Sequence, residues 1–323
     1  MAKINTVLGP VSADELGVTL MHEHLVLAYS GWECDALALP YDREAAAAAC
    51  IKALKEAKSR GLQTLVDATA TDMGRDIELQ KIVSERLGIN IICATGFYTE
   101  RYGKAGYFRF RSQAYDITTE ICDIMVKEIA QGIVNTGVKA GVIKVSTGHA
   151  RISSYEEKVL KAAARAQKET GVPIITHTEA GTMGPEQADL LISEGADPKR
   201  IVIGHMCGNA DLNYHVSVLG KGVNIAFDRL GIDVLFPDKL RKDCLIALIG
   251  MGHADRIMLS QDYWAYWMGR PFEFSDAVKP LLVNWSYVHV FNNIIPALRE
   301  AGISENKINT LMVENPRRLF DGE

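Results

Sequence analysis

Side chains that can bind metal ions interrupt or end several apolar segments of this sequence. They are four histidines, one lysine and one aspartate: His22, His24, Lys144, His177, His205 and Asp262. The first two histidines are two residues apart, and the alternation of a strand places both imidazoles on the same side. Imidazole nitrogens and carboxylate oxygens bind divalent cations such as zinc, iron, manganese and cobalt. The pattern therefore indicates a metal site, provided that the fold brings these residues together.

Each of these residues also has a simpler interpretation. A single H-x-H pair is common by chance, and a lone histidine at a strand end more often makes an ordinary hydrogen bond. Chance is a poor explanation of the whole set, because it would have to place four imidazoles and a carboxylate at the same end of several strands. We therefore interpret the set as a metal-binding cluster.

Lys144 is the most informative member, because it stands amid apolar neighbours in the segment 141–145. A lysine buried in a strand loses its hydration, and this loss favours the neutral amine. A neutral amine is a nucleophile, and we expect it to capture carbon dioxide as a carbamate. The carbamate would be an anionic ligand with two oxygen atoms, able to bridge two metal ions. The alternative for Lys144 is a salt bridge.

The remaining chemistry-bearing residues have structural explanations. Glu23 alternates to the face opposite the histidine pair, and Asp67 ends an apolar segment, so we expect both to make hydrogen bonds. His149 follows the segment 141–145 and can line the mouth of the site. Three histidines fall in or beside helical segments, where we expect surface or packing roles: His215, His253 and His289.

Eight short, β-branched and apolar segments are the candidate strands that must position these residues. They are bounded by glycine, proline or aspartate and cover residues 18–21, 64–67, 90–95, 141–145, 173–176, 201–205, 223–227 and 257–260. Amphipathic segments with helix-start signals lie between them, including residues 42–60, 76–87, 116–133, 153–170 and 185–194. Apolar strands that alternate with helices are typical of a (β/α)8 TIM barrel, whose parallel strands are buried on both faces.

We therefore expect one domain over residues 1–323, a (β/α)8 TIM barrel with C-terminal helices flanking it. Those helices are expected at residues 278–292, 294–301 and 305–320. A doubly wound open sheet is the main alternative, but its usual glycine-rich turn does not follow the first strand, which ends in Met21-His22-Glu23-His24. The chemistry of a TIM barrel lies at the C-terminal ends of its strands, where the metal-binding residues of this sequence fall.

The composition of the chain indicates which kinds of binding partner to expect. The chain of 323 residues has a formal net charge of −5, which argues against a surface built to bind nucleic acid or an anionic membrane. No apolar segment approaches the 18 residues or so of a membrane-spanning helix, and no signal peptide is apparent. The six cysteines are scattered without a C-x-x-C pair, which favours reduced thiols and a cytoplasmic location. We expect a small-molecule substrate.

A set of short motifs, in a fixed order, covers essentially the whole chain. The second motif of the set is Leu16-Gly-Val-Thr-Leu-Met-His-Glu-His24, and the last is Asn315-Pro-Arg-Arg318. The others lie at residues 6–10, 94–98, 137–144, 173–178, 203–205, 227–229 and 259–262. In this order the motifs resemble the phosphotriesterase family of the amidohydrolase superfamily, and within it the phosphotriesterase-like lactonases.

The resemblance implies a binuclear metal site and a homodimer. His22, His24 and Asp262 would bind the more buried metal, and His177 and His205 the more exposed one. Carbamylated Lys144 and a hydroxide would bridge both ions, and Asp262 would also shuttle a proton. We expect two divalent ions, zinc first, although iron, cobalt and manganese fit the same donors.

Two residues point to the substrate class. In the lactonase-like branch a tyrosine follows the third strand and an arginine follows the seventh, and Tyr98 and Arg229 match these positions. A phenol beside the exposed metal can orient a lactone carbonyl or support the oxyanion. The alternative is rim packing for Tyr98 and, for Arg229, a salt bridge to Asp228 or Asp233.

The segment 263–268 after the last strand is rich in aromatic residues and is expected to be a loop that walls a substrate channel. A lid packed on the barrel or an oligomer contact is its alternative role. No mechanism is assigned to Gln261. The expected pocket residues are Tyr29, Trp32, Tyr263, Trp264 and Trp267.

The resulting hypothesis is a metal-dependent lactonase that acts on lactones such as N-acyl homoserine lactones, with side activity on phosphotriesters and aryl esters. Quorum quenching would be its biological meaning. The first alternative is an organophosphate triesterase or another ester or amide hydrolase of the same superfamily, which the fit of a lactone ring beside Tyr98 would discriminate. The second is a catalytically silent binding barrel, which the six intact ligand positions disfavour.

Overall fold

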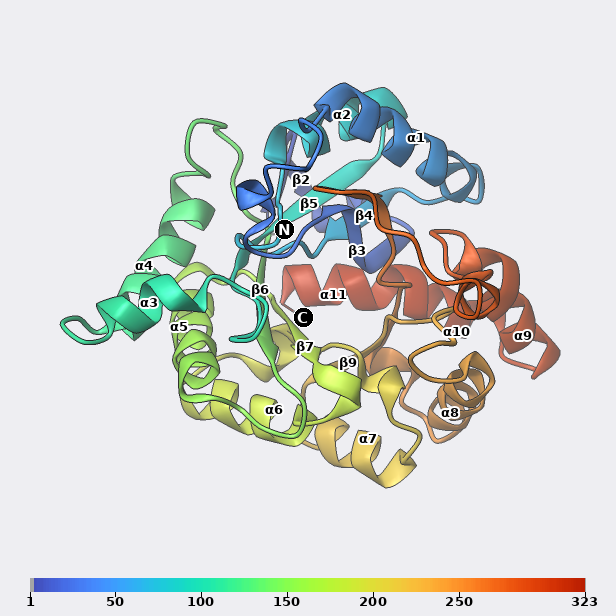
Figure 1. The fold of residues 1–323 in the computed structure, drawn as a ribbon. Helices are drawn as coiled ribbons and strands as arrows, with labels where there is room; N and C mark the ends of the chain where they lie inside the picture. Colours follow the sequence, from blue (N-terminus) through green and yellow to red (C-terminus); the bar gives the residue numbers. More distant parts are fainter. Residues whose placement is uncertain (1–2, 323) are drawn as a thin grey trace.

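A barrel of parallel strands forms the centre of the computed structural model (Figure 1). The structure describes residues 3–322, so that residues 1, 2 and 323 of the expected domain lie outside the described residues. Neighbouring strands pair in the order β10-β9-β8-β7-β6-β5-β4-β3-β11. They are β3 (Thr19–Leu27), β4 (Thr64–Asp67), β5 (Asn90–Gly96), β6 (Val142–Thr147), β7 (Ile174–Thr178), β8 (Ile201–Ile203), β9 (Asn224–Phe227), β10 (Ile257–Leu259) and β11 (Trp264–Trp267).

The first and last strands of the eightfold repeat, β3 and β10, are joined by hydrogen bonds at one end. The backbone N–H of Asp262 donates to the carbonyl oxygen of His22 at 3.2 Å. The N–H of His22 in turn donates to Oγ of Ser260 at 2.9 Å, just beyond the end of β10. The expected (β/α)8 TIM-barrel fold is confirmed.

A compact apolar core fills the inside of the barrel. Each strand from β3 to β10 contributes at least one buried apolar side chain to it, from Met21 on β3 to Met258 on β10. Leu319 and Phe320 of α11 (Asn315–Asp321) belong to the same core. The N-terminal hairpin of β1 (Lys3–Thr6) and β2 (Gly9–Ser12) adds Ile4. The hairpin and α11 therefore close one end of the barrel, and the polar residues are left to the other end.

Helices surround the strands, as Figure 1 shows, and a second apolar core lies between the two layers. They are α1 (Arg43–Ser59), α2 (Ile77–Leu87), α3 (Ala105–Arg111), α4 (Ile117–Ala130), α5 (Ser154–Thr170), α6 (Gly184–Ser193), α7 (Leu212–Leu219) and α8 (Asp238–Gly250). Their starts follow the expected signals: Asp42 caps α1, and Ser153 forms a capping box with Glu156 at the start of α5. Among the described residues, none of the helices has both the length and the apolar character to cross a membrane.

Some elements differ from the expectation. The first strand is longer than residues 18–21 and runs to Leu27, because its inward histidines interrupt the apolar pattern but not the hydrogen bonding. The aromatic segment 263–268 was expected to be a loop, which is wrong for most of it. It forms β11, whose Trp264 is in register with His24 of the outer half of β3. Aromatic residues suit such a half-buried strand.

The C-terminal helices are more broken than expected. A π-helical turn, Val290–Ile294, precedes α9 (Ile295–Glu300), and only a short 3-10 turn, Lys279–Leu282, lies in the earlier part of the expected helix 278–292. Another π-helical turn, Thr310–Glu314, joins α10 (Glu305–Asn309) to α11. α9 and α10 flank the barrel as predicted, whereas α11 lies across one end of it (Figure 1).

Candidate active site

All six residues predicted to bind metal line one small cavity at the C-terminal ends of the barrel strands. The cavity has a volume of about 60 Å³, and we call it the inner cavity. Its lysine and four histidines are each 5% exposed or less. We call the six residues the inner cluster: His22 and His24 on β3, Lys144 on β6, His177 on β7, His205 after β8 and Asp262 after β10.

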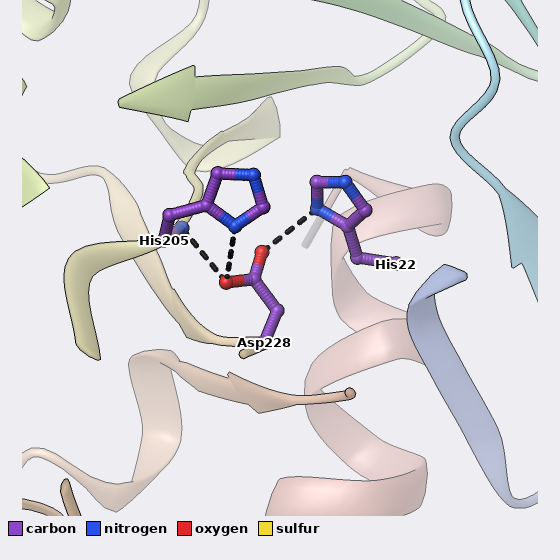
Figure 2. Close-up of side chains that lie close together, drawn as sticks. All are labelled: His22, His205 and Asp228. Carbon is purple, nitrogen blue, oxygen red and sulfur yellow. Dashed lines mark hydrogen bonds and ion pairs between the residues drawn. The ribbon is translucent and has the colours of Figure 1, made fainter. Parts of the chain in front are cut away.

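Asp228, directly after β9, orients two of the imidazoles. Figure 2 shows its carboxylate between the rings of His22 and His205. The ring N–H groups at Nδ1 of His22 and His205 donate to its two oxygens at 2.8 and 3.0 Å. The backbone N–H of His205 adds a bond of 2.8 Å. These bonds point the Nε2 atoms of both rings toward the inner cavity.

The three residues of Figure 2 lie close enough together to hold a cation, but the oxygens of Asp228 already accept three N–H groups. We therefore interpret Asp228 as an orienting residue of the kind that accompanies metal-bound histidines. The second compact group consists of His22, His24 and Asp262, whose donor atoms lie within 4.8 Å of one another.

The other two histidines are oriented by different partners. Thr69 Oγ1 donates to the carbonyl of Val26 at 3.4 Å and can accept from Nδ1 of His24 at 2.8 Å, so Nε2 of His24 faces the cavity. His177 is turned the other way. Its Nε2 atom lies 3.1 Å from Glu179, and its Nδ1 atom lies 3.5 Å from the phenol oxygen of Tyr98. Each imidazole thus has one nitrogen held by an oxygen partner at 3.1 Å or less, and for His177 the other nitrogen is Nδ1, with the phenol of Tyr98 at the longer distance of 3.5 Å.

The amine of Lys144 points at the histidines. Its Nζ atom donates to Nε2 of His22 at 2.8 Å and approaches the carbonyl oxygen of Thr176 at 3.5 Å. No carboxylate of the described residues lies within 4.0 Å of it, so the alternative salt bridge is not formed. Burial lowers the pKa of Lys144 to about 8. About a tenth of the amine is therefore neutral at pH 7, and carbamate formation requires this neutral form.

Burial also keeps three imidazoles of the inner cluster neutral. It lowers the pKa of His22, it lowers the pKa of His177 to about 4, and it lowers the pKa of His205 well below the usual value. For Asp262 burial opposes ionisation, but the guanidinium of Arg229 and the hydrogen bond with His24 hold the pKa of its carboxyl well below the usual range. Neutral imidazole and ionised carboxylate are the forms that bind metal ions.

Arg229 pairs with the carboxylate of Asp262. Its Nε–H donates to Oδ2 at 2.8 Å, whereas Oδ1 of Asp262 lies 3.1 Å from Nε2 of His24. Among the described residues the ion pair of Arg229 is with Asp262, and neither Asp228 nor Asp233 lies within 4.0 Å of its guanidinium, so these two alternative salt bridges are not formed. Asp262 has a backbone φ of 52°, which is uncommon for a residue with a side chain.

Tyr98 stands where the inner cavity opens outward. The residue is 7% exposed, and burial raises the pKa of its phenol well above the usual value, so it stays a neutral donor. Asp72 accepts the backbone N–H of Tyr98 at 3.0 Å and that of Lys104 at 2.8 Å, and so holds the loop after β5. The rim-packing alternative for Tyr98 does not account for its position beside His177.

A larger outer cavity of about 640 Å³ shares part of its wall with the inner cavity. The shared residues are Tyr29, Tyr98, Arg229, Asp262 and Trp264. Apolar side chains cover one part of the outer wall: Ile232, Val234, Leu235, Phe274, Leu282 and Trp285. Polar groups lie in the rest, including Arg101, His149 and Glu179. The outer cavity can therefore hold a largely apolar group while the inner cluster faces a polar one.

The structure brings only some of the predicted pocket residues to these cavities. Tyr29 and Trp264 line both, and His149 lines the outer cavity as expected. Trp32 instead packs edge-on against Tyr41, and Tyr263 packs against Trp285 and Tyr287. Trp267 contacts the rings of Tyr29 and Trp264 from behind. These last three residues belong to the support of the pocket and not to its wall.

Sequence reasoning missed three orienting residues: Thr69, Glu179 and Asp228. A signal was present for two of them. Asp228 directly precedes Arg229, and Glu179 lies two residues after His177, close enough for its carboxylate to reach the ring. Thr69 has no such signal, because its role depends on how β3 and β4 are placed side by side.

The donor set of the inner cluster fits divalent metal ions. Four imidazoles each present a nitrogen, Asp262 presents a carboxylate, and the second nitrogen of every ring has an oxygen partner. The cavity of about 60 Å³ has room for small ions, since about 10–15 Å³ of such space is enough for one water molecule.

Comparisons with known proteins identify the family. A model of the phosphotriesterase family matches residues 2–320. A solved structure of organophosphorus hydrolase from Deinococcus radiodurans is 46% identical, with a TM-score of 0.96, over 98% of this chain and 96% of that chain. An aryldialkylphosphatase from Saccharolobus solfataricus is 34% identical over 96% of this chain and 96% of its own length. A phospho-furanose lactonase from Mycoplasmopsis synoviae is 32% identical over 98% of this chain and 90% of its own length. The chain therefore belongs to the phosphotriesterase family, and the prediction that it is a hydrolase of this family is confirmed.

Proposed function

We propose that this hydrolase is a binuclear metal-dependent lactonase that acts on lactones with an apolar tail, such as N-acyl homoserine lactones. Side activity on phosphotriesters and aryl esters is part of the proposal. The observation that carries it is the junction of the two cavities, where Tyr98 lies beside His177 and lines the outer cavity together with its apolar residues. The relationship to a phospho-furanose lactonase supports a lactone substrate.

The inner cluster would hold two divalent ions, with zinc expected first and iron, cobalt or manganese as alternatives. His22, His24 and Asp262 form one compact donor group, and His177 and His205 supply the nitrogens opposite it. Lys144, as a carbamate, would supply oxygens between the two groups. The bound ions would lower the pKa of a water molecule and polarise the carbonyl or phosphoryl oxygen of the substrate.

The surrounding residues have separate tasks in this proposal. Asp262, held by Arg229, accepts a proton when water attacks and delivers it to the leaving group. The neutral phenol of Tyr98 donates to the oxygen that becomes negative as the lactone ring opens. The apolar wall that includes Trp264 and Trp285 excludes water and holds the tail.

Tyr98→Phe tests the phenol. Loss of one oxyanion donor costs about 10²–10³-fold in kcat in other enzymes. We expect a loss of this size for lactones and a smaller one for phosphotriesters, as measured by kcat on one metal-loaded preparation. Tyr155→Phe is the matched control, because its buried hydroxyl has no hydrogen-bond partner among the described residues. Unchanged lactone turnover in Tyr98→Phe would remove the phenol from the mechanism.

Asp228→Asn tests the orienting carboxylate. The amide keeps the shape but cannot accept from both His22 and His205, and loss of such a partner typically weakens metal binding about 10–100-fold. The dissociation constant for zinc, measured by chelator competition, should rise by that factor. The control is Asp238→Asn, which removes a similar buried contact to His289. Equal zinc affinity in the two variants would contradict the orienting role.

Carbamate formation should depend on pH through Lys144, since only the neutral amine reacts with carbon dioxide. With a pKa of about 8, the neutral fraction rises about tenfold between pH 7 and pH 9 and then levels off. The pKa of His177, about 4, keeps that imidazole neutral over this range. Metal is returned to metal-free protein at each pH, at constant dissolved carbon dioxide, and the rate at which activity recovers is measured. This rate should follow the pH dependence of the neutral fraction of Lys144. If the recovery rate instead rose about a hundredfold between pH 7 and pH 9 without a plateau, the lysine would have its ordinary pKa, and the lowered pKa of Lys144 would be contradicted.

The substrate proposal is tested by kcat/KM for a short and a long acyl homoserine lactone, a phosphotriester and an aryl ester on one metal-loaded preparation. Lactone turnover several decades above the others is expected. The second candidate function is an organophosphate triesterase, which the relationship to an organophosphorus hydrolase and an aryldialkylphosphatase favours. A phosphotriester preference would select it. The homodimer, the cytoplasmic location and the role in quorum quenching stay predictions.

A further inference from the structure

Glu23 is a carboxylate with 0% exposure that lies between His22 and His24 on β3. Successive side chains of a strand point to opposite faces, so Glu23 faces away from the inner cavity. Burying a carboxylate is costly unless hydrogen-bond donors replace its water. The hydrogen-bond donors around Glu23 therefore indicate its role.

The two oxygens of Glu23 accept three hydrogen bonds from one turn, residues 260–263. Oε1 accepts from Oγ of Ser260 at 2.9 Å and from the N–H of Gln261 at 2.8 Å. Oε2 accepts from the N–H of Tyr263 at 2.8 Å. Glu23 is thus bonded to the chain on both sides of Asp262.

The backbone of Asp262 needs such support. Its φ of 52° lies in the left-handed region, which is strained for a residue with a side chain and persists only where the surroundings enforce it. Its N–H donates to the carbonyl of His22 at 3.2 Å. Because the residues before and after Asp262 donate to one carboxylate, Glu23 restrains the peptide units that aim this side chain.

We propose that Glu23 is a positioning residue, which holds the turn 260–263 so that the carboxylate of Asp262 faces the histidines of β3. The proposal rests on the proposed function in one respect, since it takes Asp262 to be a metal ligand. On this account β3 contributes in two ways: His22 and His24 bind from its inner face, and Glu23 sets the third ligand of the same group from its outer face.

Glu23→Gln is the test. The glutamine amide has one accepting oxygen and one donating NH2 group, whereas the carboxylate has two accepting oxygens. The NH2 group must therefore face either the two donors at Ser260 and Gln261 or the donor at Tyr263. We expect the cobalt dissociation constant to rise about 10–100-fold. The visible absorption spectrum of the cobalt-loaded protein should change, because it reports the ligand geometry. We also expect kcat to fall more than KM changes.

Glu128→Gln is the matched control. Glu128 is a buried carboxylate on α4 that binds Arg75, outside the inner cluster. A merely structural effect would lower the melting temperature in both variants and leave the cobalt spectrum of both unchanged, and this result would overturn the proposal. If Glu23→Gln does not fold, Glu23→Asp keeps both accepting oxygens but withdraws them by one methylene group, and it should show a smaller change of the same kind.

Crystallography of the metal-free Glu23→Gln protein separates this proposal from the proposed function. The expected result is a displaced turn 260–263, with Asp262 no longer beside His24. An unchanged turn would overturn the positioning role even if the wild-type protein binds metal. A wild-type protein that binds no cobalt would instead overturn the proposed function, and the position of Asp262 in the variant would still decide the role of Glu23.

Discussion

Asp262→Asn should lower kcat/KM for every substrate by about 10³-fold or more, since loss of general acid–base catalysis alone costs about 10²–10⁴-fold. Asp262 contacts His24 and Arg229, and it has the strongly lowered pKa of a carboxylate that stays ionised. The neutral amide is a weaker metal ligand and cannot take up a proton. Lactones and phosphotriesters should therefore lose activity together.

The matched control is Asp276→Asn, which changes an exposed aspartate, 97% accessible in its side chain. Its kcat/KM should stay within about twofold of the wild type, because exposed substitutions of this kind change little. Metal content must be measured on both proteins. If Asp262→Asn left the turnover of one substrate class intact, Asp262 would not be the shared proton carrier.

Lys144→Met removes the side chain that is proposed to bridge the two groups of metal-binding residues. The methionine keeps an unbranched side chain in a buried strand position, so the barrel is expected to fold. Without an amine no carbamate can form, and we expect metal content to fall from about two ions per chain to one or fewer. Activity should fall by at least about 10²-fold, and added bicarbonate should not restore it.

Lys139→Met is the control for this change, because it removes an exposed lysine near the start of the same strand. Elemental analysis of both proteins after identical metal loading gives the comparison. Full occupancy by two ions in Lys144→Met would mean that the remaining residues of the inner cluster are sufficient. The carbamate would then be unnecessary for the site.

The barrel was predictable because its signals are local. Each strand is an apolar segment that ends in a turn, and helix starts such as Asp42 and Ser153 carry their own capping side chains. Where the site interrupts that pattern, prediction was less accurate. The histidines interrupt the apolar pattern of β3, so the predicted strand was shorter than the observed one. The aromatic residues of β11 did not indicate that Trp264 pairs with His24.

The candidate ligands were predictable for a similar reason, since their residue types are unusual at strand ends. Their orientation was not, because it depends on contacts between distant segments. Asp228 acts on His22 across 206 residues of sequence, and Glu23 acts on the turn around Asp262 across a similar separation. Trp32 illustrates the opposite case: it was expected in the pocket because it follows the first strand in the sequence, and its ring packs against Tyr41.

Anomalous diffraction from crystals of the metal-loaded protein, recorded at the absorption edge of the metal, tests the central claim most directly. Two separate peaks in the inner cavity are predicted, one among His22, His24 and Asp262 and one beside His177 and His205, with extra density on Lys144. A single peak, or a peak against the carboxylate of Asp228, would contradict the account.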